Sequence, residues 1–190
     1  NPEFGTLADF NNVVSQAHAL GIKVIIDWVP NHTGADHEWL TTHPDFYERD
    51  STGKAIFTAD WSDTRELNFA NPVMQDSMIA AMKYWISNTK IDGFRVDVAW
   101  GVPHSFWNRC IPELRKARPL FMLAEADDAL LHNTGFDATY SWSEFHVMTD
   151  IAAGKKDVLS LDSVLTKIDT SYMKGAWRLY FTSNHDENSW

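Results

Sequence analysis

The sequence predicts an α/β protein in which helices cover a parallel sheet, arranged as in a β/α barrel. Apolar runs of strand length alternate along the chain with segments of helical periodicity, which is the pattern of parallel βα units. Polar side chains follow the carboxyl end of nearly every expected strand, where a β/α barrel presents its active site. An open doubly wound sheet shares that rule, but it would more often show a Gly-rich phosphate loop, and the sequence has none.

The first helix and the first strand are indicated by a capping pattern and an apolar run. A helix is expected to begin at Thr6, which has Asp9 three residues further on, and to end at Gly21. Residues 22–29 are mostly apolar, as in a strand buried in a parallel sheet, and Pro30 terminates the run. The residues that follow should therefore lie at the carboxyl edge of the sheet.

Polar side chains gather at the end of this first strand. Asp27 interrupts the apolar run, and Asn31 and His32 follow Pro30 directly. Residues 33–68 then lose all periodicity and are rich in aromatic residues, Asp, Thr and Gly. Because they are longer than an ordinary strand–helix loop, we expect an irregular inserted subdomain with a functional role.

The stretch 91–100 follows a helix expected to start at Pro72, and it carries the main functional signal. Its apolar and charged residues alternate in the order Phe94, Arg95, Val96, Asp97 and Val98. This period of two predicts a short strand, from which Arg95 and Asp97 leave on the same face. Arg95 should hold Asp97 ionised and oriented, as an anionic nucleophile requires. On this stretch alone, a buried structural ion pair explains the pattern equally well.

The second half of the chain repeats the alternation. Helices are expected at 103–115 and 158–168, and strands at 119–125, 136–140 and 177–183. Glu125 stands at the carboxyl end of an otherwise apolar strand, and His185 and Asp186 come just after the last one. All three should therefore lie at the same edge of the sheet as Asp97.

Composition narrows the class of protein and of partner. The chain has 190 residues, 44% hydrophobic and 22% charged, as in one globular domain with a sizeable core. The net charge of −10 argues against a nucleic-acid partner or an anionic membrane surface. The single cysteine, Cys110, excludes an intrachain disulfide framework and is expected to be a buried small apolar residue. We find no signal peptide, transmembrane run or repeat, and the first residues resemble the interior of a domain.

Five short motifs carry a resemblance to a known family. In chain order they are DWVPNH at 27–32, TRELN at 64–68, GFRVD at 93–97, LAE at 123–125 and FTSNHD at 181–186. Each motif alone is a weak match, but four of them stand in the right order on expected strand ends. The sequence therefore resembles the α-amylase superfamily, glycoside hydrolase family 13, over almost its whole length.

The resemblance implies a TIM (β/α)8 barrel, of which residues 1–190 form a partial catalytic domain that covers about strands 3–7. The family's remaining strands and its usual C-terminal β-domain would be absent. Five adjacent strands leave two barrel edges unpaired, so we expect the chain to be a segment of a longer barrel. Residues 33–68 would correspond to the family's inserted domain B.

The resemblance also implies a role for the polar strand-end residues. Asp97 would be the nucleophile that forms a covalent glycosyl-enzyme. Glu125 would be the acid that protonates the leaving oxygen and then the base that activates water. Asp186 would be a third carboxylate that grips sugar hydroxyls and helps to distort the ring. The expected substrate-binding residues are Arg95, His32 and His185, with Asp27 orienting Arg95.

The chemistry requires no cofactor, but the resemblance makes calcium a candidate structural ion. Asn31 matches a position that often binds calcium in this family, and Glu66 lies where the motif at 64–68 often offers a carboxylate. Calcium usually takes about 6–8 oxygen ligands, and Asn31 would otherwise cap a turn. The sequence departs from many family members in having Trp100 and Gly101 in place of a Lys-His pair, so only the Gly101 carbonyl remains as a ligand there.

Four tryptophans lie near expected loop ends. They are Trp28, Trp61, Trp100 and Trp142. Stacking on glucose rings and packing in the core are both open to each of them.

The predicted function is a retaining α-glycosidase that hydrolyses α-1,4-glucosidic bonds in starch-type glucans or maltooligosaccharides, like an α-amylase. An α-glucan transglycosylase or debranching relative would use the same three carboxylates. A catalytically silent carbohydrate-binding homologue would usually have lost one of them. The expected partner is an α-glucan or oligosaccharide, with no nucleic acid and no membrane segment in this chain. The resemblance favours an extracellular or periplasmic location.

Overall fold

A sheet of five parallel strands forms the centre of the fold. The computed structural model describes residues 2–187, and its central sheet has the strand order β1-β4-β5-β6-β7. The strands are β1 (Ile25–Trp28), β4 (Gly93–Val96), β5 (Phe121–Ala124), β6 (Ala138–Tyr140) and β7 (Trp177–Leu179). Each neighbouring pair is parallel, so the carboxyl ends of all five strands meet at one edge.

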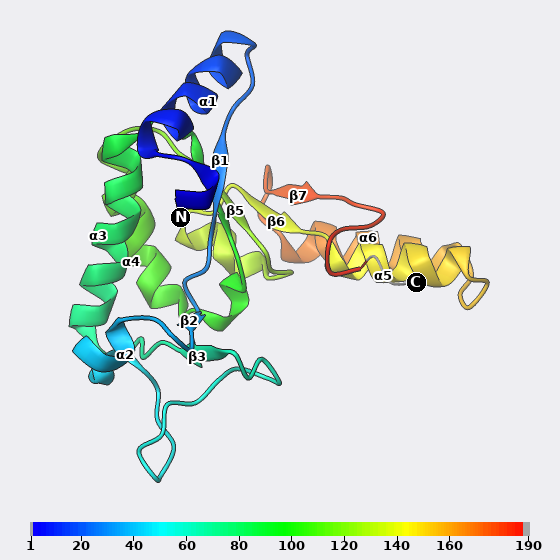
Figure 1. Cartoon of the computed structure of the whole chain (residues 1–190). Helices are drawn as coiled ribbons and strands as arrows, with labels where there is room; N and C mark the ends of the chain where they lie inside the picture. The colour runs from blue at the N-terminus through cyan, green and yellow to red at the C-terminus, as the bar shows by residue number, and fades with distance from the viewer. Residues whose placement is uncertain (1, 188–190) are drawn as a thin grey trace.

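Helices alternate with these strands along the chain. They are α1 (Leu7–Ala19), α2 (Trp39–Thr42), α3 (Pro72–Asn88), α4 (His104–Arg115), α5 (Trp142–Ala152) and α6 (Leu159–Ser171). Short 3-10 helices occur at Pro2–Phe4, Pro44–Phe46, Ala99–Gly101 and Ala129–Thr134. Helices α3 and α4 lie side by side, and α5 and α6 form a second pair near β6 and β7 (Figure 1). Within residues 2–187, no helix has the length and apolar character needed to cross a membrane.

The two helices expected to begin at Thr6 and Pro72 do begin there, and the structure shows a capping side chain at each start. The hydroxyl of Thr6 accepts the backbone N–H of Asp9, and the Asp9 carboxylate accepts the backbone N–H of Thr6. This capping box satisfies two donors that the first turn of α1 leaves free. At the start of α3, whose first residue is Pro72, the Asn71 side-chain oxygen accepts the backbone N–H groups of Val73 and Met74.

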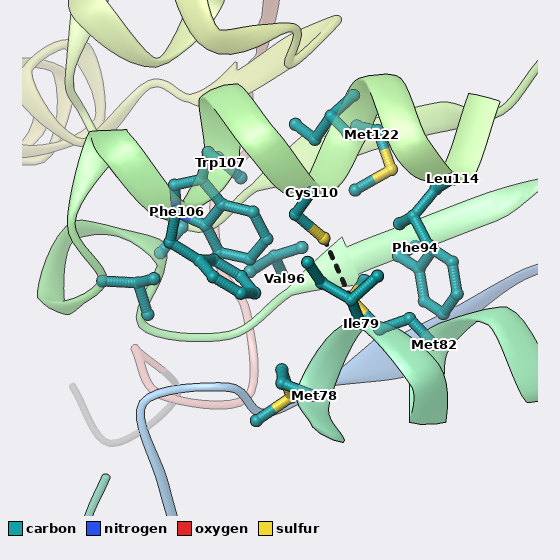
Figure 2. Close-up of a cluster of buried hydrophobic side chains, with 14 of the residues drawn as sticks. Met78, Ile79, Met82, Phe94, Val96, Phe106, Trp107, Cys110, Leu114 and Met122 are labelled. Atoms are coloured by element: carbon teal, nitrogen blue, oxygen red, sulfur yellow. Dashed lines mark hydrogen bonds between the residues drawn. The ribbon is translucent and has the colours of Figure 1, made fainter. Parts of the chain in front are cut away.

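A core between the sheet and helices α3 and α4 fixes the orientation of β4 (Figure 2). Figure 2 shows its members Met78, Ile79, Met82, Phe94, Val96, Phe106, Trp107, Cys110, Leu114 and Met122. Because Phe94 and Val96 are fully buried in this core, Arg95 between them points to the opposite face of the sheet. Cys110 is buried as predicted, with its thiol 3.7 Å from the Met82 sulfur, and burial raises its pKa to about 12.

The segment between β1 and α3 lies at the carboxyl edge of the sheet (Figure 1). It contains a small antiparallel sheet of β2 (His32–Gly34) and β3 (Thr64–Glu66), with α2 between them. Phe46, Tyr47 and Leu67 from this segment are 2% exposed and belong to the same core as α3 and β4. A separate inserted subdomain at 33–68 stays a prediction.

All five expected strands are present, but each is shorter than the apolar run that predicted it. The alternation up to Val98 is the clearest error, because β4 ends at Val96. Val98 has a φ of 46°, since the chain turns at the end of the strand into the 3-10 helix that follows. Helix α5 was not predicted, because Ser, Thr and Asp interrupt its short apolar pattern.

Candidate active site

One buried arginine connects three carboxylates at the carboxyl edge of the sheet. Nη1 of Arg95 donates to Oδ1 of Asp97 at 2.6 Å and to Oδ1 of Asp27 at 2.9 Å. Its Nη2 lies 3.1 Å from Oε1 of Glu125, an ion pair without the geometry of a hydrogen bond. Burial opposes the charge of Arg95, but hydrogen bonds with Tyr140, Asp27 and Asp97 raise its pKa above the usual range. The guanidinium is therefore a permanent cation beneath the site.

The pairing of β1, β4 and β5 brings these groups together. Asp27 and Arg95 are register partners in adjacent strands. Gly93 permits the close approach of β5, because a Cβ atom there would lie 1.8 Å from the carbonyl oxygen of Phe121. Beyond the strand ends, the backbone N–H of Glu125 still donates to the Val96 carbonyl at 2.9 Å. Asp97 and Glu125 are therefore held on neighbouring chain segments.

The pKa of the Glu125 carboxyl lies above its ordinary value. Burial raises its pKa, and the nearby charge of Asp97 adds to the effect. The N–H of Val98, which donates to Oε2 at 2.8 Å, and the charge of Arg95 act in the opposite direction. Burial outweighs them, so Glu125 keeps its proton to a higher pH than an ordinary glutamate does.

A pocket of about 350 Å³ opens above these groups. Its wall is formed by His32, Trp61, Asp63, Thr64, Asp97, Val98, Trp100, Glu125 and Asp186. The structure therefore brings the three predicted catalytic carboxylates and His32 to one cavity. Arg95, predicted to bind substrate, lies beneath Asp97 and Glu125 and is not part of this wall.

The two histidines predicted to contact substrate differ in position. His32 lines the pocket, and burial lowers its pKa despite the nearby charges of Asp97, Asp63 and Glu66. His185 is 70% exposed, lies 3.4 Å from the Asp186 carboxylate and does not line the pocket. The geometry therefore supports direct sugar contact for His32 more strongly than for His185.

The tryptophans divide into two groups. Trp61 and Trp100 line the pocket, and Trp100 is 60% exposed. Trp28 packs against Phe94 and donates its indole N–H to the Met78 sulfur, and Trp142 stands at the start of α5 among other aromatic rings. Of the four, only Trp61 and Trp100 line the pocket that holds Asp97 and Glu125.

Sequence reasoning missed three residues of the pocket wall. Asp63 comes from the aperiodic segment, where only its closeness to Trp61 in the sequence could have indicated it, and Thr64 is the first residue of the motif at 64–68. Val98 was assigned to a strand, which concealed its place above Glu125.

The candidate calcium residues lie beside the pocket and share one neighbour. The Asn31 amide donates to the Thr58 hydroxyl at 3.0 Å, and that hydroxyl donates to the Glu66 carboxylate at 3.3 Å. The Asn31 side chain also closely approaches Gly101, where a Cβ atom would lie 2.4 Å from its oxygen. These oxygens have the chemistry that calcium prefers. Within the described residues, however, no group of three or more His, Cys, Asp or Glu side chains could hold a metal.

Taken together, this geometry defines a class of protein. A parallel βα sheet in which Asp97 and Glu125 share both one arginine and one pocket has the arrangement that a barrel-type glycosidase requires. The family model of the α-amylase catalytic domain matches residues 1–61 and 46–119. The chain therefore belongs to the α-amylase family of glycoside hydrolases and related transglycosylases.

Known relatives agree with this assignment. A cyclomaltodextrin glucanotransferase from Bacillus licheniformis is 29% identical over 98% of the chain and 31% of its own length. An α-amylase structure from Lactobacillus plantarum matches with a TM-score of 0.91 and 31% identity, over 98% of this chain and 48% of that one. The α-amylase of Geobacillus thermoleovorans, solved with acarbose, matches with a TM-score of 0.76 and 29% identity, over 92% and 43%.

The chain spans less than half the length of these relatives. Its five parallel strands are therefore part of the α/β barrel that such enzymes have, which confirms the predicted fold class.

Proposed function

We propose that this chain carries the catalytic centre of a retaining α-glycosidase that hydrolyses α-1,4-glucosidic bonds in starch-type glucans or maltooligosaccharides. One observation carries the proposal: Asp97 and Glu125 contact the same guanidinium and line the same pocket. Retaining glycosidases need two carboxyl groups only about 5–5.5 Å apart, and two groups on one guanidinium are suitably close.

The two carboxyl groups would act in two steps. In the first, Asp97 attacks the anomeric carbon while Glu125 gives its proton to the glycosidic oxygen, and that bond breaks. The product is a sugar joined covalently to Asp97 and a free leaving sugar. In the second, Glu125 takes a proton from water, whose oxygen attacks the same carbon and releases Asp97. Two inversions give net retention of the α-configuration.

The charged groups around the pocket suit these two reaction steps. Nη1 of Arg95 donates to Oδ1 of Asp97 at 2.6 Å, which orients the carboxyl group that would attack the sugar. Because its pKa is raised, the Glu125 carboxyl would hold the proton that the departing oxygen requires. Asp186 and His32 line the same pocket and would bind sugar hydroxyls there.

The substrate class is inferred from the pocket and from relatives. Trp61 and Trp100 offer flat apolar surfaces beside carboxylates, as a sugar with apolar faces and polar edges requires. The structural neighbour from Geobacillus thermoleovorans is described as complexed with acarbose. An α-glucan oligosaccharide fits both observations.

Transglycosylation is the second candidate, and the exposed indole of Trp100 favours it. Trp100 is 60% exposed and lines the pocket, where it would hold an acceptor sugar in place of water. A glucanotransferase is also among the relatives matched over nearly the whole chain. The chemistry at Asp97 and Glu125 would be unchanged, and only the acceptor would differ.

Product analysis separates these functions. The full-length protein would be given soluble starch and maltoheptaose, beside its Asp97→Asn variant and an Asp162→Asn control on the exposed surface of α6. We expect shortened α-anomeric products from the wild type and the control, and a loss of about 10³-fold or more in Asp97→Asn. Products longer than the maltoheptaose supplied would identify the protein as a transglycosylase. No turnover by a folded protein that still binds glucan would leave a silent binding homologue.

A further inference from the structure

Tyr140 contacts Arg95, the arginine that pairs with Asp97 and Glu125. It ends β6 and is 8% exposed. Nε of Arg95 donates to its hydroxyl oxygen at 3.3 Å, and the guanidinium carbon lies 5.6 Å from the centre of its ring. Tyr140 is the neutral member of the group around Arg95, because the other partners named above are carboxylates.

The contacts of Arg95 use the whole edge of its planar guanidinium. Nε faces Tyr140, Nη1 faces Asp27 and Asp97, and Nη2 faces Glu125. Because the guanidinium is rigid, fixing Nε also fixes the direction of both Nη groups. We propose that Tyr140 is a positioning residue for glycoside cleavage, which sets the plane of Arg95 between Asp97 and Glu125 and links it to the segment that carries Asp186.

The link to Asp186 runs through aromatic rings. The Tyr140 ring centre lies 5.5 Å from that of Phe181 and 5.8 Å from that of Trp142. Phe181 in turn stacks on Phe145 at 4.9 Å and belongs to the segment that leads from β7 to Asp186. One side of Tyr140 therefore contacts the cation of the site, and the other contacts the chain that delivers the third carboxylate.

The molecule contains a matched arrangement on the other face of the sheet. Arg178 also contacts a tyrosine, Tyr172, through its hydroxyl and over its ring at 4.2 Å, and it pairs with Asp127 and Glu144. Thr139, the neighbour of Tyr140 on β6, accepts from Arg178, so this second cluster lies on the opposite face from Arg95. Tyr172 therefore provides a control that loses the same hydroxyl from the same kind of cluster without touching the pocket.

The proposal rests on the proposed function and adds a pH signature to it. Glu125 is faced by Arg95 from β4, by Asp97 after β4, by Asp186 after β7, and by His32 and Asp63 across the pocket. Of these groups, Arg95 holds the pKa of Glu125 down, and Asp97 raises it. Without the Tyr140 hydroxyl, Arg95 should be held less firmly beside Glu125 and should lower its pKa less. The alkaline limb of the pH–activity profile should then move to higher pH.

The test compares Tyr140→Phe with Tyr172→Phe in the full-length protein, on maltoheptaose between pH 4 and 9. We expect Tyr140→Phe to lower kcat about 10-fold with KM changed less than about twofold, and to move the alkaline limb up by about half a pH unit. Tyr172→Phe should lower the melting temperature but keep the shape of the pH profile. A merely structural role for Tyr140 would make the two variants alike.

Two further outcomes keep the proposal separate from the proposed function. An inactive wild type would overturn the proposed function, whereas an active wild type with an unshifted Tyr140→Phe profile would overturn the role of Tyr140 alone. If circular dichroism shows that Tyr140→Phe does not fold, Arg95→Lys serves instead, because lysine keeps the charge but has no Nε to anchor. It should move the alkaline limb in the same direction, and an unchanged limb would contradict the proposal.

Discussion

The backbone N–H of Val98 donates to Oε2 of Glu125 at 2.8 Å, across the ends of two neighbouring strands. Val98 can do so because it leaves the strand conformation, with a φ of 46°. The same turn carries Asp97 into the pocket one residue earlier. The nucleophile candidate and the group that fixes the acid candidate are therefore positioned by one local feature of the chain.

Glu125→Gln should remove the acid and leave the nucleophile. We expect the hydrolysis of maltoheptaose to fall by about 10³-fold or more, because the leaving sugar then departs without a proton. A maltosyl fluoride needs no proton for departure, so its first-step rate should fall far less. The burst of fluoride release measures that step. Equal losses on both substrates would show that Glu125 is not the acid.

The raised pKa of Glu125 also makes stability depend on pH. The buried site favours the protonated carboxyl, so its contribution is fully present below the ordinary pKa of 4.5 and is lost as the pH rises through the raised value. Glutamine stays neutral, so the melting temperature of Glu125→Gln relative to wild type should increase as the pH rises from 4 to 8. Calorimetry measures this difference, with Glu38→Gln at an exposed carboxylate as the correction for lost charge. A difference that falls with pH would contradict the assignment.

Much of this architecture follows from local rules that act on a few residues. The capping pair of Thr6 and Asp9, and Pro72 as a first helical residue, mark helix starts because they act within one turn. Asp97, Glu125 and Asp186 could be brought together from sequence because parallel strands present their carboxyl ends at one edge. Those parts of the fold and of the site were predictable for physical reasons.

Other parts depend on contacts between distant segments. Asp63 joins the pocket wall through the aperiodic segment, whose path is set by packing of Phe46 and Leu67 on the core. The hydrogen bond from Arg95 to Tyr140 crosses from β4 to β6, and no spacing in the sequence reports it. His32 and His185 look equivalent as motif members, and only the structure separates the pocket wall from the exposed position.

The two histidines therefore make a sharp comparison. His32 lines the pocket and its pKa is lowered by burial, so at neutral pH it is an uncharged ring that can hydrogen-bond a sugar. We expect His32→Ala to reduce kcat/KM for maltoheptaose by about 10²-fold and His185→Ala by less than about 10-fold. Steady-state kinetics at pH 7 measure both. The reverse order would show that His185 turns into the pocket when substrate binds.

Calcium binding at Asn31 and Glu66 stays a prediction, and its test uses the metal alone. If the ion binds these oxygens, calcium should raise the melting temperature of the full-length protein and a chelator should lower it. Asn31→Ala should then abolish most of the difference between the two conditions. Magnesium at the same concentration is the control, since it prefers a smaller and more regular set of ligands. The same melting temperature with calcium and with chelator would contradict the prediction.

Substitution of Gly93 tests whether the close approach of β4 and β5 sets the positions of Asp97 and Glu125. A Cβ atom at this position would lie 1.8 Å from the Phe121 carbonyl oxygen, so Gly93→Ala must push the two strands apart. We expect the free energy of unfolding to fall by about 2–4 kcal/mol and kcat to fall as well, because Asp97 and Glu125 then separate. Gly21→Ala is the matched control: it meets nothing within 4 Å, but its φ of 75° is strained for alanine. It should lose only about 1 kcal/mol and keep its activity, as measured by urea unfolding beside maltoheptaose turnover. If Gly93→Ala lost stability but kept full kcat, the spacing of these two strands would not set the geometry of the carboxyl pair.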